Sequence, residues 1–353
     1  MIIIKKIALF IIRKAKKSYY LRGLLSQTNS NKPKIIPFQK FTDDKKNIYQ
    51  LYKGYREAMQ PGWKNALSPL NSLKLPNEKE IIKSVSKAKK LIDDSVVLLN
   101  NFNFNFEEKT ILEFGCNDGS KSCALANLGP EEVIGSDISY YYQLDRKDDS
   151  ISKKSLKENE YLLNLRNVII EKSLAKKAQC EPKFFEDNIC NSSFKSNSFD
   201  LIFSWNVLEH IQKPELAINE IFRILKPGGI VFNKYNPFFC QGGGHSLCTL
   251  DFPWGHVRLD ESSFEKYIKE IRPEELDIAL PFYKNSLNRM TMKKLKEYHI
   301  RSGFDLLTVL PYLKQSNINE VTEEILDQSK ANYPTIDFLD LVSNGVICIG
   351  RKN

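Results

Sequence analysis

The sequence predicts an α/β fold with a doubly wound, mostly parallel sheet, and three observations carry this prediction. A short apolar strand, Ile111–Phe114, leads into a glycine turn that closes at Gly119 and opens a helix of small residues. A second strand, Val133–Asp137, follows roughly twenty residues later and ends in an acid, as strands of nucleotide-binding sheets do. An amphipathic helix that starts at Pro214 is followed directly by a further strand, Ile230–Tyr235.

The glycine turn favours a ligand other than a pyrophosphate. Gly115 and Gly119 lack a Cβ, so the backbone can bend sharply and approach a ligand, toward which the next helix points its N–H groups. A dinucleotide site needs a middle glycine that this turn lacks, so an NAD-dependent oxidoreductase conflicts with the sequence. Glu113 and Asp118 add carboxylates, which would repel a phosphate and suit a ligand with an ammonium or sulfonium charge.

These motifs, in this order, resemble the class I S-adenosylmethionine-dependent methyltransferases, and within them the broad type-11 methyltransferase group. The resemblance is strong over residues 109–235. It is carried by EFGCNDG at 113–119, by the two strands that end in acids, and by the long motif pair within 197–229. It implies a Rossmann-like, seven-stranded sheet in the order 3-2-1-4-5-7-6, with an antiparallel edge from strands near 304–310 and 345–350.

The resemblance implies S-adenosylmethionine as the methyl donor and points to the residues that bind it. Asp137 is expected to bind the ribose hydroxyls, and Asp187 with Asn188 to hold the adenine. The other expected cofactor residues lie in the glycine turn and at the end of the fourth strand: Glu113, Gly115, Asn117, Gly119, Ser204 and Trp205. The family commonly has glycine where this chain has Asn117, but asparagine tolerates the left-handed backbone region, so we expect the turn to survive.

The charge of the chain is concentrated in an N-terminal arm. The net charge is +9 over 353 residues, but residues 1–40 hold ten basic residues and no acid, so the remainder carries a net charge of −1. A neutral body gives no electrostatic footprint for nucleic acid. Residues 1–25 can form a basic helix that lies on an anionic membrane surface or packs on the domain, and both readings stay open. Seven scattered cysteines indicate neither a disulfide framework nor a zinc motif, so we expect a cytoplasmic protein.

We expect three parts in the chain: the basic arm of residues 1–40, a helical cap subdomain of residues 41–100, and a Rossmann-like methyltransferase domain of residues 101–353. Helical spacing over Asp43–Met59, and again from Asn77 to Leu99, predicts the cap. Within the domain, residues 236–288 are longer than a connection between strands requires, so we expect a substrate-side insertion after the fifth strand.

The insertion contains the candidate catalytic residues His245, Asp251 and His256, because it follows the carboxyl end of the fifth strand, where open α/β sheets hold ligands. A histidine with a pKa near neutral can accept the proton of a hydroxyl. This favours O-methylation of a small-molecule or glycan-type acceptor, although a structural role is an equal alternative for each histidine. We expect His210 to be structural. The spacing of the three candidates matches no metal-ligand pattern, so we predict no metal.

Two other functions are compatible with the same fold. A non-catalytic S-adenosylmethionine-fold binding module is the main alternative, and Asn117 in the glycine turn is its support. An aminopropyl transferase of polyamine synthesis would need acidic residues around an amine pocket, which the histidine-rich insertion does not offer.

Overall fold

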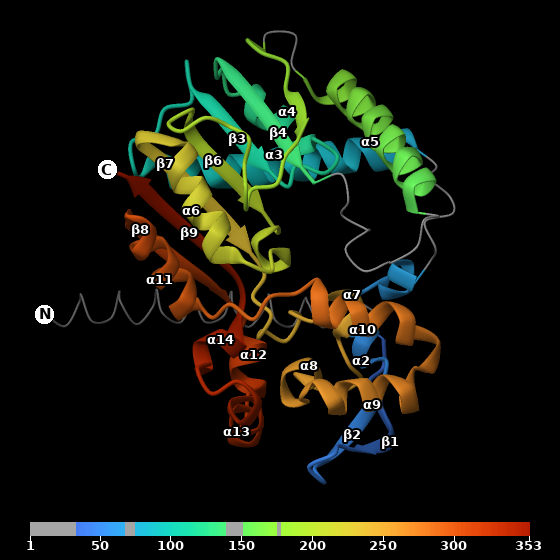
Figure 1. Ribbon diagram of the computed structural model, residues 1–353. Coiled ribbons are helices and arrows are strands. Elements are labelled where there is room, and N and C mark those ends of the chain that lie inside the picture. The colour runs from blue at the N-terminus through green and yellow to red at the C-terminus, as the bar shows by residue number, and fades with distance from the viewer. Residues whose placement is uncertain (1–32, 68–74, 139–150, 175–177) are drawn as a thin grey trace, which may run out of the picture.

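The computed structural model describes residues 33–67, 75–138, 151–174 and 178–353. Its larger part is a seven-stranded sheet with helices on both faces (Figure 1). The strands of this sheet are β3 (Thr110–Phe114), β4 (Glu132–Asp137), β5 (Lys183–Glu186), β6 (Phe199–Trp205), β7 (Leu225–Tyr235), β8 (Phe304–Leu313) and β9 (Ser343–Lys352). The helices around it are α3 (Glu78–Asn100), α4 (Ser120–Ala126), α5 (Ile151–Ser173), α6 (Pro214–Ile224) and α11 (Met292–Ser302).

The strand order confirms the predicted topology. The strands lie in the order β5-β4-β3-β6-β7-β9-β8, which reads 3-2-1-4-5-7-6 when the strands of this sheet are numbered along the chain. Neighbours from β5 to β7 pair in parallel, whereas β9 is antiparallel to both β7 and β8. The carboxyl ends of the parallel strands therefore meet at one edge, which is where open α/β sheets bind ligands.

Both faces of the sheet are buried. Ile111 and Leu112 are successive residues of β3, yet they enter different cores because side chains alternate along a strand. The core around Ile111 includes side chains of α3 and α4, and the core around Leu112 includes side chains of α6 and α11. Helix α11 begins after the N-cap Thr291 and ends at the C-cap Gly303, whose φ is +101°.

A second core lies below the sheet in Figure 1 and joins segments that are far apart in the sequence. It is formed by an N-terminal hairpin, by the insertion after β7, and by residues 321–341. Trp254, at the centre of the insertion, is almost fully buried and donates its Nε1–H to the Leu341 carbonyl at 3.1 Å. The insertion is therefore a packed lobe. Its helices, and those of the segment between β8 and β9, are α7 (His245–Cys248), α8 (Gly255–Arg258), α9 (Glu261–Ile271), η3 (Pro273–Glu275), α10 (Leu276–Asn285), α12 (Gln315–Glu320), α13 (Glu323–Asn332) and α14 (Phe338–Val342).

The predicted helix over Asp43–Met59 is wrong. Strands β1 (Ile36–Thr42) and β2 (Ile48–Lys53) form an antiparallel hairpin there, and only the short helices α2 (Tyr55–Met59) and η1 (Trp63–Leu67) follow. The side chains of Phe41, Tyr49 and Leu51 pack into the second core. The buried residues of β2 therefore follow the two-residue period of a strand and not the period of a helix. Because α3 packs on the sheet instead, residues 41–100 are shared between two cores, and their description as one cap subdomain stays a prediction.

Residues 1–32 of the basic arm lie outside the described residues, and with them the predicted membrane-surface helix of residues 1–25. The rest of the arm leads into β1 and forms most of that strand. In the part of the chain that the structure describes, no helix is long and apolar enough to cross a membrane. All seven cysteines are free, as their scattered spacing predicts.

Burial of His299 makes stability depend on pH. In α11, its Nδ1 lies 2.8 Å from the Leu295 carbonyl and its Nε2 lies 3.7 Å from the Cys348 thiol. Desolvation lowers the pKa of His299 to about 4, whereas a histidine in an unfolded chain titrates near 6.5. Between these values only the unfolded chain binds the proton. We therefore expect acidification from about pH 6.5 to 4 to lower the free energy of unfolding by about 3 kcal/mol through this residue, with no further loss below about pH 4.

Urea unfolding of wild type and His299→Gln between about pH 7 and pH 4 measures this contribution. The variant will be less stable at neutral pH, but its free energy of unfolding should fall less on acidification, by up to about 3 kcal/mol. Parallel pH profiles for the two proteins would contradict the expected titration of His299.

Candidate active site

The glycine turn between β3 and α4 has the backbone conformation that a close ligand approach requires. Gly115 and Gly119 have φ of +70° and +77°, and Asn117 has φ of +44°, so asparagine does adopt the left-handed region expected of it. A Cβ on Gly115 would lie 2.2 Å from a methyl of Val207, and one on Gly119 would lie 2.5 Å from the ring of Phe184. The two glycines are therefore needed for both conformation and space.

Asp137 places a carboxylate beside this turn. The Asn117 N–H donates to its Oδ2 at 2.8 Å, and the Ile138 N–H donates to its Oδ1 at 2.9 Å. Burial raises the pKa of Asp137, and the two N–H donors act against that shift. The carboxylate is thus held in a fixed orientation at the end of β4, the position from which acids of nucleotide-binding sheets reach a ribose.

Asp187 contributes a second carboxylate, directly after β5. Its Oδ1 accepts hydrogen bonds from the N–H and the hydroxyl of Ser193, both at 2.8 Å. Its Oδ2 is buried and has no hydrogen-bond partner among the described residues. A buried oxygen in this state requires a donor, and the amino group of an adenine is one. The neighbouring Asn188 uses its Oδ1 to accept the Cys190 N–H at 3.0 Å.

Glu113 does not face a ligand. It is fully buried, with Lys121 Nζ 3.0 Å from Oε1 and the Ser122 hydroxyl donating to Oε2 at 2.5 Å. Since α4 already compensates the charge of this carboxylate, the expected contact with a positively charged ligand does not agree with the structure. Glu113 instead ties the end of β3 to the helix that follows the turn.

The end of β6 is also used for packing. Ser204 is fully buried and donates its hydroxyl to Asn233 Oδ1 at 2.7 Å. Trp205 stacks on the sheet with its ring centroid 6.3 Å from those of Phe203 and Phe232. These contacts hold β6 against β7, and they differ from the cofactor contacts expected of Ser204 and Trp205.

Two of the three candidate catalytic residues lie inside the second lobe. His256 is buried with Nε2 2.9 Å from the Phe238 carbonyl, and desolvation lowers its pKa to about 4. Asp251 Oδ2 accepts the Tyr267 hydroxyl at 2.5 Å, and its backbone carbonyl accepts the Tyr52 N–H at 2.7 Å. The prediction that His256 and Asp251 are catalytic does not agree with this placement, because both groups serve internal hydrogen bonds.

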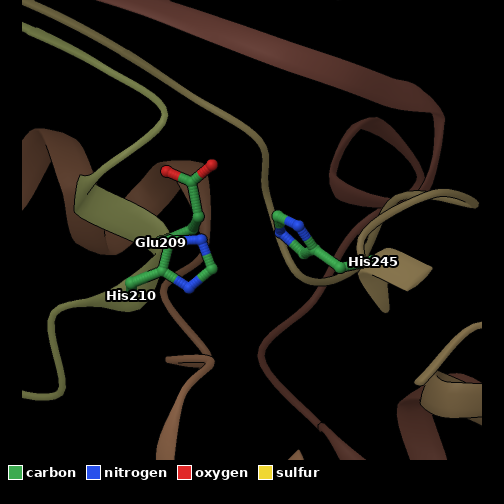
Figure 2. A group of neighbouring side chains, drawn as sticks. All are labelled: Glu209, His210 and His245. Atoms are coloured by element: carbon green, nitrogen blue, oxygen red, sulfur yellow. The ribbon is translucent and has the colours of Figure 1, made fainter. Parts of the chain in front are cut away.

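The third candidate, His245, meets two residues that follow β6. A carboxylate oxygen of Glu209 and one ring nitrogen each of His210 and His245 lie within 4.8 Å of one another. Figure 2 shows the His245 ring on the opposite side from the other two side chains, facing them. The two rings have centroids 4.9 Å apart. We call these three residues the Glu-His-His cluster. The segment that leads to Glu209 adjoins the glycine turn, because Val207, two residues before Glu209, packs against Gly115.

Burial controls the protonation of the cluster. Desolvation raises the pKa of Glu209 to about 7 and lowers that of His245 to about 3. The His245 imidazole is therefore neutral at physiological pH, and it is a weaker proton acceptor than the sequence-based prediction of a general base requires. Desolvation also lowers the pKa of His210.

Sequence reasoning missed Glu209 and treated His210 as structural. The available signal was an adjacent acid and histidine directly after the fourth strand, whose carboxyl end lies at the ligand edge of the sheet. The segment after α10 holds this pair in place: His210 Nδ1 is 2.8 Å from the Ser286 carbonyl, and the Asn288 N–H donates to the Glu209 carbonyl at 2.9 Å.

Part of this chain is similar to known methyltransferases. Residues 112–233 match the family model of a methyltransferase domain. The sterol 24-C-methyltransferase of Pneumocystis carinii is 26% identical over 137 residues, which cover 37% of this chain and 30% of that protein. The mitochondrial ubiquinone biosynthesis O-methyltransferase of Dictyostelium discoideum is 26% identical over 136 residues, which cover 38% of this chain and 37% of that protein. The chain thus spans about a third of the length of these curated relatives.

Among solved structures, an S-adenosylmethionine-dependent methyltransferase from Methanosarcina mazei shares 19% identity and a TM-score of 0.41, covering 71% of this chain and 95% of that chain. The family match extends from β3 to β7 and includes the glycine turn, Asp137, Asp187 and the Glu209–His210 pair. S-adenosylmethionine is the methyl donor of this family. Residues 112–233 are therefore a methyltransferase domain of the class I, S-adenosylmethionine-dependent type.

Proposed function

We propose that this chain transfers a methyl group from S-adenosylmethionine to a hydroxyl oxygen of a small-molecule or glycan-type acceptor. The observation that carries the proposal is the convergence of two kinds of groups at one edge of the sheet. Asp137 ends β4 and Asp187 directly follows β5 there, and the residues of the Glu-His-His cluster follow the neighbouring strands β6 and β7. The first pair suits a nucleoside, and the cluster suits a polar acceptor.

The residues present fit the cofactor. Asp137 would accept hydrogen bonds from the ribose hydroxyls, and the unpartnered Oδ2 of Asp187 would accept one from the adenine amino group. The turn at Gly115 and Gly119 leaves room for the backbone to approach the ligand. When bound, S-adenosylmethionine supplies a methyl group on a sulfonium. As the acceptor oxygen bonds to this carbon, the carbon–sulfur bond breaks, its electron pair stays on sulfur, and the hydroxyl proton leaves to solvent.

The relatives do not decide which atom is methylated. One is named a sterol C-methyltransferase and another an O-methyltransferase, so carbon and oxygen acceptors both occur among them. Support for oxygen comes from the cluster, because a carboxylate and two imidazoles can bind and polarise a hydroxyl. Methyl transfer depends strongly on positioning, so groups that orient the hydroxyl contribute much of the rate.

A methyl-transfer assay with isotope-labelled S-adenosylmethionine tests the proposal on matched acceptors that carry a hydroxyl, an amine or an activated carbon. The expected product is an ether from the hydroxyl acceptor, with S-adenosylhomocysteine formed in equal amount. A methylated amine or carbon product would refute oxygen as the acceptor atom. Tight cofactor binding without any product across hydroxyl acceptors would favour the binding module instead.

Alanine in place of Asp137 is expected to weaken cofactor binding by about 1.5–3 kcal/mol, or roughly 10- to 150-fold, because hydrogen bonds to a charged group are lost. Asp118→Ala is the matched control. The sequence suggested that this carboxylate of the same turn faces the ligand, but in the structure it accepts from Ser84 of α3 at 3.1 Å and from the Ser120 N–H at 3.0 Å. Calorimetric titration with S-adenosylhomocysteine measures both variants, and equal losses of affinity would reject the ribose role of Asp137.

A further inference from the structure

We propose that Glu209, His210 and His245 bind a divalent transition-metal ion at the cofactor edge of the sheet. The binding site itself follows from the side chains alone. A second step, that the ion holds the hydroxyl of the methyl acceptor, rests on the proposed function. Neither the family model nor the relatives' names assign a metal to this position.

Two buried atoms of the cluster require a partner. Glu209 is 1% exposed, and its Oε2 has no hydrogen-bond donor among the described residues, while Oε1 accepts the Asn236 N–H at 3.2 Å. The His245 Nε2 is likewise buried without a partner in the described ranges. An unsatisfied buried acceptor is costly, and in Figure 2 the His245 ring faces the Glu209 carboxylate. A cation between them would satisfy both.

The surroundings of His210 match those of a metal-bound histidine. Such a residue usually donates its second ring N–H to a carbonyl or carboxylate, which fixes the tautomer and the ring. With Nδ1 2.8 Å from the Ser286 carbonyl, the Nδ1–H tautomer of His210 puts the lone pair on Nε2. Asn288 fixes the same turn by donating Nδ2–H to the Leu208 carbonyl at 2.6 Å and to the Ile211 carbonyl at 2.8 Å.

The donor set indicates the class of ion. Two imidazoles and one carboxylate suit Zn²⁺, Mn²⁺ or Fe²⁺, whereas Mg²⁺ prefers oxygen ligands. Zinc bonds to such ligands are about 2.0–2.2 Å long, so the donor atoms, now within 4.8 Å of one another, would close around an ion by roughly an ångström. Three protein ligands leave at least one coordination position for another molecule.

That open position gives the site a chemical role. An ion lowers the pKa of a bound hydroxyl, so the proton can leave to water without a strong protein base. The oxygen lone pair then forms the new carbon–oxygen bond, and sulfur keeps the pair of the broken carbon–sulfur bond. In this arrangement His245 is a ligand and remains neutral. The nearby cation, Lys234, is directed toward the amide oxygens of Asn206 and Asn236.

Metal titration of the full chain, made without a histidine tag and cleared of metal by a chelator, tests the site directly. Zn²⁺ and Mn²⁺ are titrated by calorimetry into wild type, Glu209→Gln, His245→Gln and the control Asp251→Asn. The control removes a carboxylate of the same insertion that binds Tyr267 instead. We expect one ion per wild-type chain and a loss of affinity of at least about 100-fold in both cluster variants, since even supporting residues contribute about 10- to 100-fold. Asp251→Asn should stay within about 3-fold of wild type.

The outcomes separate the metal site from the proposed function. The proposed metal site is overturned if wild type binds neither ion. It is also overturned if wild type and Glu209→Gln bind an ion with equal affinity. Co²⁺ gives a second measurement that needs no folded variant: visible bands of a four- or five-coordinate ion are expected in wild type, and their absence also overturns the site. S-adenosylhomocysteine binding is measured in the same metal-free samples, so a failure of the cofactor site is recorded independently.

Discussion

Alanine in place of Arg56 is expected to lower the free energy of unfolding by about 3–5 kcal/mol, because it removes one partner of a buried ion pair. The Arg56 guanidinium binds both carboxylate oxygens of Glu275, at 2.6 and 2.8 Å, and each side chain is at most 3% exposed. It also donates to the Ser246 carbonyl and lies 3.7 Å from the centre of the Trp63 ring. Loss of Arg56 leaves the Glu275 carboxylate buried and releases the backbone next to His245.

Lys89→Ala is the control for Arg56→Ala. Its partner is Asp93 at 2.8 Å, one turn along α3, and both side chains are more than half exposed. Removal of such a surface pair is expected to change stability by less than about 0.5 kcal/mol. Chemical unfolding measures the free energy of unfolding of both variants. If Arg56→Ala and Lys89→Ala lose similar amounts, the buried pair of Arg56 and Glu275 does not stabilise the fold as expected.

Alanine in place of Gly115 is expected to lower the free energy of unfolding by about 2–5 kcal/mol and to abolish cofactor binding, since a conformational penalty and a steric clash add. The residue has φ of +70°, which disfavours any side chain, and a Cβ there would lie 2.2 and 2.8 Å from the two methyl groups of Val207. Relief of the clash requires movement of the segment that leads to Glu209. The substitution would therefore disturb the cofactor turn and the Glu-His-His cluster together.

Gly228→Ala separates the two penalties. Gly228 has φ of +78°, but a Cβ there meets no atom within 4 Å, so only the conformational cost of about 1–2 kcal/mol is expected. This variant should bind S-adenosylhomocysteine like wild type. If Gly115→Ala is no more destabilised than Gly228→Ala and still binds the cofactor, the close packing against Val207 is not important for the site.

The parts of the fold that local sequence determines were predicted correctly. The glycine turn follows from the need for positive φ at Gly115 and Gly119. The strand order follows from the resemblance. The hairpin β1–β2 was missed because Asp43–Met59 also fits a helical period, and only packing against the distant insertion selects the strand.

The place of Asp137 in the fold was predictable from the sequence, whereas the Glu-His-His cluster was not. Asp137 sits at the end of a strand, so its place in the sheet follows from the pattern of the sequence. The contact between Glu209 and His245 depends instead on the path of a long insertion, which no local rule determines. Asp251 and His256 were expected at the substrate, but the aromatic residues around them pack into the second core together with the N-terminal hairpin and residues 321–341.

Thermal unfolding with S-adenosylmethionine, S-adenosylhomocysteine and NAD tests the central claim, that the edge formed by the glycine turn, Asp137 and Asp187 binds the methyl donor. A ligand at 100 times its dissociation constant raises the free energy of unfolding by about 2.7 kcal/mol. For a chain of this size, Tm then rises by several degrees. We predict a shift with S-adenosylmethionine and S-adenosylhomocysteine and none with NAD. No shift with either adenosyl compound, or a shift with NAD alone, would contradict the claim.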